Sequence, residues 1–379
     1  MKKYYQNSKA SHGLSLIELL IAMALGLTIT AGVIQIYVGN NATERSQEAR
    51  GRIQENGRFA LNFLSQELRM AGYLGCLSGI NAASVNNILN APPASFQPQI
   101  GLQGWEAAGT NPDTISNSVN NVAVVATGAG GWGTTGGNVL PAFNAIPGSD
   151  IIRAWSSFGT AAIINTVTAG VTPVINSRPI NIAANDFLLL SDCDQADLVQ
   201  ACAVANVGPG ISTNITLSTA CVPGNVASSA ITSQAGGEVV KLEGTLLYVG
   251  KRGDVATNPP ALFVRRLGAN GIPGVAEELI EGVESMQALY GVNMDNDVRN
   301  TVDSYLPADQ VPDWTNVISI RITLLMQSIE SGVVPAAQAY TFNGVTYDGG
   351  GGNGALPGDT RVRRVFSSTI NLRNRALGI

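Results

Sequence analysis

The stretch GLSLIELLIAMALGLTITAGVIQIYVGNN, residues 13–41, decides how this chain is organised. Between Leu14 and Val38 its only formal charge is the carboxylate of Glu18. A helix needs about 20 mainly apolar residues to cross a bilayer, so the run is long enough to span a membrane. A lone carboxylate inside hydrocarbon is costly unless it has a partner. The segment therefore predicts a membrane-spanning helix over 14–38 whose acid has a specific purpose.

The charges on either side of this run predict its orientation. Three lysines and no acid precede it, whereas the arginines that follow, between residues 45 and 58, alternate with glutamates. The short basic end should stay in the cytoplasm, and the chain after the apolar run should lie on the opposite side of the membrane. No small-residue cleavage site follows the apolar core, which argues against an ordinary secretory signal peptide. A simple signal anchor remains an alternative.

The charged residues after position 13 exclude several classes of function. The chain has a net charge of −5, and without the basic leader 19 basic and 27 acidic residues leave −8. Such an acidic body argues against nucleic acid as a main partner, because phosphate binding needs a basic surface. The only histidine, His12, lies in the leader, so a mature chain would lack histidine catalysis and histidine metal ligands. We expect no enzyme activity and no cofactor; a membrane-anchored enzyme that uses carboxylates is the alternative.

Four cysteines, Cys76, Cys193, Cys202 and Cys221, lie beyond the apolar run. An even number of cysteines in a compartment outside the cytoplasm predicts two disulfides. A zinc site of four thiolates is the rival, but the C-x-x-C spacing of such sites is missing. Of the three possible pairings we favour Cys76–Cys193 with Cys202–Cys221, the second of which closes a short local loop. The sequence alone does not decide the pairing.

An amphipathic helix is predicted to continue the apolar run over residues 39–75. Its apolar positions recur in steps of three, four and seven residues, as on one face of an α-helix. Glycines at 72 and 75 are typical of a helix end. This half of the helix should pack under a globular domain through Ile53, Ala60, Leu64, Leu68 and Ala71.

The second half of the chain has the regular patterns of β-strands. Residues 186–193 (DFLLLSDC) read as a buried strand, and residues 238–252 and 261–267 read as neighbouring strands. The clearest pattern is WTNVISIRITLLMQS, 314–328, which alternates apolar and polar side chains as in a half-buried antiparallel sheet. One face should hold Ile318, Ile320, Ile322, Leu324 and Met326.

The last segment, RRVFSSTINLRNR at 363–375, alternates in the same way through Phe366, Ile370 and Leu372. The predicted architecture is α+β, a long N-terminal helix packed on an antiparallel β-sheet domain. The β-rich domain should span 76–379 and contain a variable Gly/Asn-rich insertion near 80–180.

That insertion contains only short strand signals, NVAVVATG at 121–128 and DIIRAWSSFG at 150–159. The intervening GAGGWG, 128–133, matches a dinucleotide-binding pattern in form. Glycines and a proline follow it where such a site needs a helix, so we interpret it as a surface loop.

A weak calcium candidate lies in NMDNDVRNTVD, 293–303, where Asn293, Asp295 and Asp297 occupy alternate positions. The turn glycine and the bidentate glutamate of a calcium loop are both missing. We therefore expect no metal there and favour an Asx-rich turn.

GLSLIE, at the start of the apolar run, resembles the class III signal of type IV pilins and pseudopilins. The resemblance implies that prepilin peptidase cleaves between Gly13, the last residue of a leader over 1–13, and Leu14, which becomes N-methylated. Glu18 then takes the place of the family's fifth mature residue, which pairs with an N-terminal ammonium and sets the register of assembly. This chain has leucine where phenylalanine is commoner, and Gly26 and Gly32 where major pilins have a proline.

Further segments resemble the PilW-type minor pilins: QENGRFALNFLSQELRMAGYLGC, SDC, LLYVGKR…ALFVRRL, EGVESMQALYGVN and the two alternating strands. The likeness covers the first 76 residues and most of 186–376. It implies a minor pilin that is held in the inner membrane with its domain in the periplasm and then enters the pilus. Such pilins are thought to prime assembly, in some cases to end at the tip, and to support twitching motility and adhesion.

The implied partners are other minor and major pilins, prepilin peptidase, the inner-membrane assembly platform and the lipid bilayer. The J-type minor pseudopilin of type II secretion is the alternative with the same fold.

Overall fold

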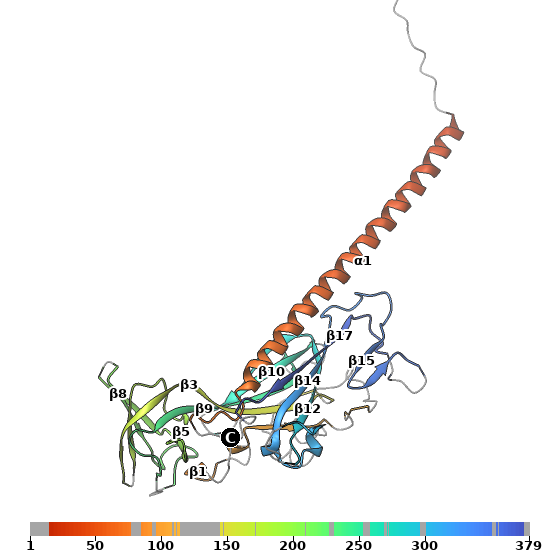
Figure 1. Ribbon diagram of the computed structural model, residues 1–379. Helices are drawn as coiled ribbons and strands as arrows, with labels where there is room; N and C mark the ends of the chain where they lie inside the picture. Colours follow the sequence, from red (N-terminus) through yellow and green to blue (C-terminus); the bar gives the residue numbers. More distant parts are fainter. Residues whose placement is uncertain are drawn as a thin grey trace, which may run out of the picture.

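The computed structural model (Figure 1) describes most of the chain after the leader. The described residues are 15–76, 85–92, 96–107, 110, 112–113, 145–146, 148–170, 172–208, 210–226, 231–252, 258–268, 271, 273–295, 301–350, 354 and 356–374. The predictions for the leader, for 121–128 and for 128–133 lie outside them.

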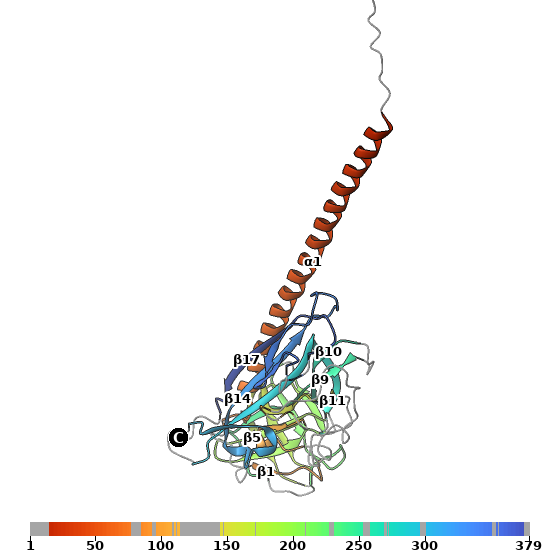
Figure 2. The ribbon, with the colours of Figure 1, turned by 90° about the vertical axis from the view of Figure 1, so that its right-hand side faces the viewer.

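One helix, α1, runs without interruption over Leu16–Arg69. At 1.5 Å per residue it is about 80 Å long. Its N-terminal half projects away from the β-rich part of the molecule in both views (Figures 1 and 2). The chain leaves the helix through Gly72 and Gly75, which both have positive φ angles that favour glycine. The described part of the predicted segment 14–38 and most of the predicted segment 39–75 thus form one continuous helix, which ends at Arg69 instead of at 75 because the chain already turns toward Gly72.

The predicted apolar face of the C-terminal half of the helix is confirmed. Ile53, Ala60, Leu64 and Leu68 are buried in the largest apolar core of the described residues, together with Ala49 of the helix and Ala71 just beyond its end. Because the face follows the helical period, burying it fixes how the helix lies on the domain.

A large mixed sheet of 11 strands extends from beside the C-terminal part of α1, where β10 lies, to β3 and β8 at the left of Figure 1. Its central path has the order β1-β6-β5-β9-β3-β4-β8-β7; β2 pairs with β3, and β10 pairs with β9 and β11. Only β1 and β6 pair in parallel among these strands. The bounds are β1 Val85–Asn87, β2 Leu102–Trp105, β3 Ile151–Thr168, β4 Val174–Ser177, β5 Phe187–Ser191, β6 Ala196–Gln200, β7 Ala203–Val207, β8 Ser212–Thr216, β9 Glu238–Lys251, β10 Pro260–Leu267 and β11 Pro273–Glu281, with a 3-10 turn η2 at Pro98–Ile100.

A second, antiparallel sheet lies against α1 and has the order β13-β12-β14-β17. The helix contacts β17, β14 and β11. A small hairpin, β15 with β16, packs on the other side of this sheet. The bounds are β12 Val283–Val292, β13 Ser304–Leu306, β14 Val317–Gln327, β15 Tyr340–Phe342, β16 Val345–Tyr347 and β17 Arg363–Asn371, with 3-10 turns η5 at Ala308–Gln310 and η6 at Trp314–Asn316. The predicted α+β architecture is confirmed.

The pattern predicted for β14 is right in its centre and wrong at one end. A shift in register opposite Gly291 and Val292 places Val317 in the core instead of Ile318, which is buried elsewhere. Leu325, on the face expected to meet water, is buried under the β15–β16 hairpin. The sheet is therefore covered on both faces along part of its length.

Two disulfides cross-link the domain. Cys76, just after the helix, is bonded to Cys193 at the turn between β5 and β6, with Cα atoms 4.9 Å apart. Cys202 is bonded to Cys221 across 5.2 Å between Cα atoms. This is the pairing that the sequence analysis favoured.

Candidate functional site: the long helix and its seat on the domain

Glu18 closes the first turn of α1 in a reciprocal cap. Its Oε2 accepts a hydrogen bond from the backbone N–H of Ser15 at 3.0 Å, while Ser15 Oγ accepts from the N–H of Ile17 at 3.3 Å. This capping box satisfies donors that a helix start leaves without partners. It also turns the carboxylate toward the N-terminal end of the helix. Gly13 and Leu14 lie outside the described residues, but Leu14 directly precedes this cap in the sequence.

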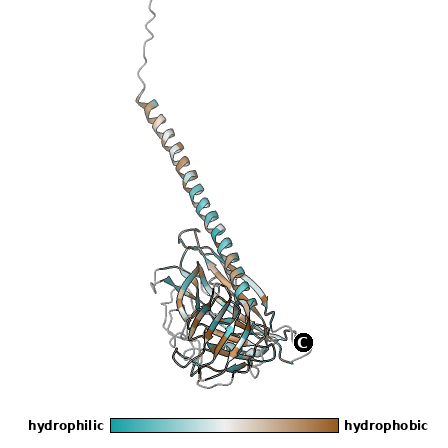
Figure 3. Cartoon of the chain, turned by 90° about the vertical axis from the view of Figure 1, so that its left-hand side faces the viewer, coloured by the Kyte–Doolittle hydropathy of each residue, from teal (hydrophilic) through white to brown (hydrophobic). Residues whose placement is uncertain are grey.

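The helix surface after this cap is apolar and unburied. Leu16 is 76% exposed and Leu27 is 71% exposed, and none of the most apolar 18-residue window of the helix is buried. Within the helix, Figure 3 shows the hydrophobic colouring mainly toward its free end and the hydrophilic colouring nearer the domain. By length and composition the helix can cross a membrane. So large an apolar surface requires lipid or neighbouring helices around it.

The C-terminal half of α1 is fitted closely to strand β17. A Cβ atom placed on Gly57 would lie 2.6 Å from Cε2 of Phe366, far inside van der Waals contact. Glycine at this position therefore lets the ring of Phe366 lie directly on the helix backbone. Asn56 Nδ2 next to it donates to the carbonyl oxygen of Glu281 at 3.3 Å, which ties the helix to the end of β11.

Polar contacts lie at both ends of the surface where residues 49–68 of α1 pack on the domain. Near the end of the helix, Glu67 accepts from Thr245 Oγ1 at 3.2 Å and forms an ion pair with Arg266 at 3.3 Å. Near the start of the seat, Arg52 lies 3.3 Å from Glu330. The Arg52 pair is exposed and contributes little to stability.

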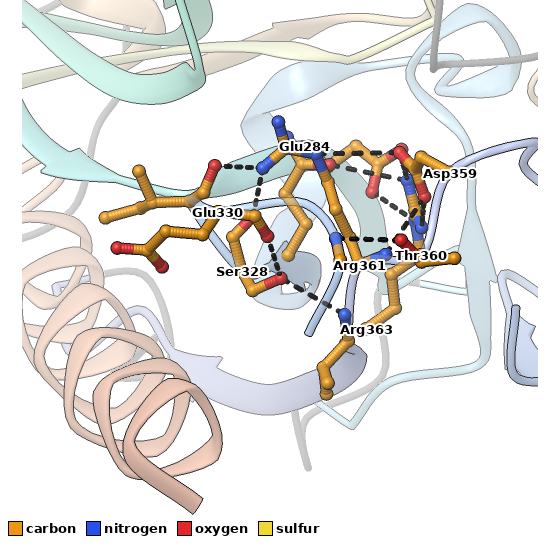
Figure 4. A network of polar contacts seen from close by, with 11 residues as sticks. Glu284, Ser328, Glu330, Asp359, Thr360, Arg361 and Arg363 are labelled. Carbon is orange, nitrogen blue, oxygen red and sulfur yellow. Dashed lines mark hydrogen bonds and ion pairs between the residues drawn. The ribbon is translucent and has the colours of Figure 1, made fainter. Parts of the chain in front are cut away.

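A network of buried charges lies under the loop that carries Glu330 (Figure 4). Arg363 forms ion pairs with Glu284 at 2.7 Å and with Asp359 at 2.6 Å, and the Arg363 and Glu284 side chains are almost wholly buried. Burial raises the pKa of Glu284, against the opposing charge of Arg363. Arg361 donates to the carbonyl oxygens of Ser328 and Ile329. The network joins the segment that follows β14 to the segment that leads into β17.

Two further acids, Glu106 and Asp150, are buried between the two sheets. Asp150 accepts from the backbone N–H groups of Ala107, at 3.0 Å, and Ala288, at 2.8 Å. Glu106 accepts from the N–H of Ala308 at 3.2 Å. Burial raises the pKa of Glu106 to about 7 and that of Asp150 well above its usual range. These acids join β3, β12 and η5, and the sequence analysis did not single them out because no motif contains them.

The weak calcium candidate is a hydrogen-bonded turn over its described part. Asp303 Oδ2 accepts from the N–H groups of Met294, at 2.7 Å, and Asp295, at 3.3 Å. Asn293 is buried, Asp295 is exposed and Asp297 lies outside the described residues. Within the described part of the chain, no three His, Cys, Asp or Glu residues are grouped so that they could hold a metal ion.

Two family matches fall on the two halves of this arrangement. Residues 247–374 match the family described as Type IV Pilus-assembly protein W, and residues 8–34 match the Prokaryotic N-terminal methylation motif. The first match contains the sheet that seats α1, and the second contains Glu18 and the start of the apolar half. The two descriptions name a protein of pilus assembly and the N-terminal motif of methylated prokaryotic proteins. No curated protein and no solved structure matches the chain significantly.

Proposed function

We propose that this chain is a PilW-type type IV pilin, a minor pilin that helps to start pilus assembly and remains at or near the filament tip. The observation that carries the proposal is the division of α1. One half is seated on the domain through a buried face, and the other half is free, apolar and headed by Glu18.

The proposed mechanism begins with removal of the leader. Prepilin peptidase cleaves between Gly13 and Leu14 and leaves an α-ammonium, which is then N-methylated, next to the capped turn. Glu18 pairs with this ammonium on its own chain or on a neighbouring pilin, because an ionised carboxylate in an apolar helix bundle is stable only with a partner. The pair sets the register in which the helix enters the bundle.

In this proposal the helix is a membrane anchor first and part of the filament core later. Before assembly the apolar half crosses the inner membrane and the β-rich domain lies in the periplasm. The contacts around Gly57 hold the domain at a fixed angle on the helix, so that pulling the helix into the bundle also places the domain. Other pilins and the inner-membrane assembly platform are the proposed partners, with twitching motility and adhesion as the outcome.

Glu18→Ala, introduced into the full chain, tests this mechanism. We expect pili to be lost or strongly reduced while the protein remains at normal levels in the membrane, since the variant removes one carboxylate and one cap. Thr30→Ala is the matched control, because Thr30 is an exposed polar side chain of the same helix half whose hydroxyl bonds only to the carbonyl of Gly26. Normal piliation in the Glu18→Ala strain would refute the mechanism.

A deletion of the gene for this chain distinguishes a role in the type IV pilus from a role in type II secretion. Loss of surface pili and of twitching supports the proposal. Loss of exoprotein release with intact pili would instead indicate that the chain is a pseudopilin of type II secretion.

A further inference from the structure

The large sheet ends in a lobe formed by the far part of β3 with β4, β8 and β7. Figure 1 shows this lobe on the side of the molecule away from the free half of α1. One face of the lobe is covered, with Ile164, Ile175 and Ile215 fully buried. On the other face Asn176 donates to Asn214 at 2.6 Å, which links β4 to β8.

Strand β7 is the last strand of this lobe, and its outer edge has no paired strand among the described residues. Val204 is half-buried and the other four side chains of the strand are exposed. β7 pairs with β8 over its whole length without a register shift, so its backbone is regular. A regular edge presents a row of unpaired N–H and C=O groups to any strand that approaches.

Proteins usually protect such edges with charged side chains, proline or bulges. β7 has the sequence AVANV and contains none of these. The lack of charge extends far beyond the strand, since no charged residue occurs between Asp197 and Glu238. This edge is therefore open to strand pairing on grounds of charge as well as geometry.

We propose that β7 pairs in antiparallel fashion with β7 of a second copy of this chain, about a two-fold axis at Ala205. This register places Ala203 opposite Val207 of the second copy and Ala205 opposite its own counterpart. In a two-fold contact each strand faces an identical strand, so a charged residue near the axis would face the same charged residue of the second copy. β7 carries no charge and its side chains are small, which is the composition that self-pairing requires.

The end of the β7–β8 turn adds apolar contact to this interface. Val207 is 42% exposed and Ile211 is 68% exposed, and the Ile211 side chain lies over Gly208. The other end of β7 follows Cys202, which is anchored to Cys221. The edge is thus ordered before it pairs, which lowers the entropic cost of association.

The expected association is weak in solution. Five residues of strand pairing bury much less surface than the roughly 1,600 Å² of a standard interface. Two copies held in one membrane have a higher effective concentration, which raises the paired fraction without new contacts. We therefore expect pairing to be detected most readily with the full chain in vesicles.

Ala205→Cys is the direct test, because residues opposite each other in antiparallel strands have Cβ atoms about 4.5–5.5 Å apart, close to disulfide distance. The full chain with this change, in phosphatidylethanolamine and phosphatidylglycerol vesicles, should form a covalent dimer under mild oxidation. Val275→Cys is the control, since Val275 is 83% exposed on β11, away from this edge. Cross-linking at 205 no greater than at 275 would overturn the proposal.

Charge reversal provides an independent arm. Ala205→Glu and Ala205→Lys, each introduced into the full chain in the same vesicles, should abolish association measured by energy transfer between fluorescently labelled copies, because like charges then face each other at the axis. Mixing the two variants should restore association, since opposite charges face each other in the mixed dimer. Association of either single variant equal to that of the wild type would contradict self-pairing at β7.

Discussion

At the scale of single residues, the seat of the helix depends on a glycine. Gly57 has no side chain to separate the helix backbone from the ring of Phe366. We predict that Gly57→Ala lowers the free energy of unfolding of the full chain by about 1–3 kcal/mol, as for other overpacked contacts. Chemical denaturation measures the change. Gly51→Ala is the control, because open space surrounds Gly51 and alanine gains about 1 kcal/mol in a helix; equal destabilisation by both variants would refute the close contact.

A single buried acid should make stability depend on pH. Burial raises the pKa of Glu106 from 4.5 to about 7, so the folded chain holds a proton that the unfolded chain releases. Its contribution is fully present below pH 4.5 and is lost as the pH rises to about 7. We predict that the free energy of unfolding of Glu106→Gln, relative to wild type, increases over this range. A difference that does not change between pH 4.5 and 7.5 would exclude the raised pKa.

At the scale of elements, the two disulfides close loops of different length. Cys76–Cys193 spans 117 residues and ties the end of α1 to the large sheet, whereas Cys202–Cys221 spans 19. Loop-closure entropy predicts a cost of about 5 kcal/mol for losing the first and about 3 kcal/mol for losing the second. Urea unfolding of the two paired Cys→Ser variants should show this order, and the reverse order would show that strand contacts, not loop closure, set the cost.

Helical and strand periodicity made some elements predictable from the sequence. The buried face of α1 follows the 3.6-residue period, and the centre of β14 follows the two-residue period. The bulge that replaces Ile318 by Val317 arises from pairing with β12, which a single strand's pattern does not contain. The cover over Leu325 likewise comes from a separate hairpin.

The candidate site likewise contains contacts within one segment and contacts between segments far apart in the sequence. Glu18 was singled out because it is the lone charge of the apolar run and because GLSLIE resembles a pilin signal. Its cap with Ser15 was missed, although the S-x-x-E spacing of residues 15–18 is the sequence pattern of a capping box. Gly57 and Phe366 are 309 positions apart, and the acid pair Glu106 and Asp150 lies in the stretch of the chain with the weakest patterns. The long strand β3, of which only the start was predicted as a strand, shows how pairing with β9 and β4 extends an element beyond its local signal.

At the scale of the whole molecule, the account rests on cleavage before Leu14. The free apolar half of α1 is long and apolar enough to cross a membrane, and its capped start places Glu18 near the residue that would become the new terminus. Every step of the proposed assembly follows from that terminus, because it supplies the charge that Glu18 lacks within the helix.

The intact mass of the protein purified from its native membrane shows whether the chain is cleaved before Leu14. We expect a mature chain that begins at N-methylated Leu14 and retains both disulfides. A chain that still begins at Met1, or one cut after Val38 at the end of the apolar run, would contradict it.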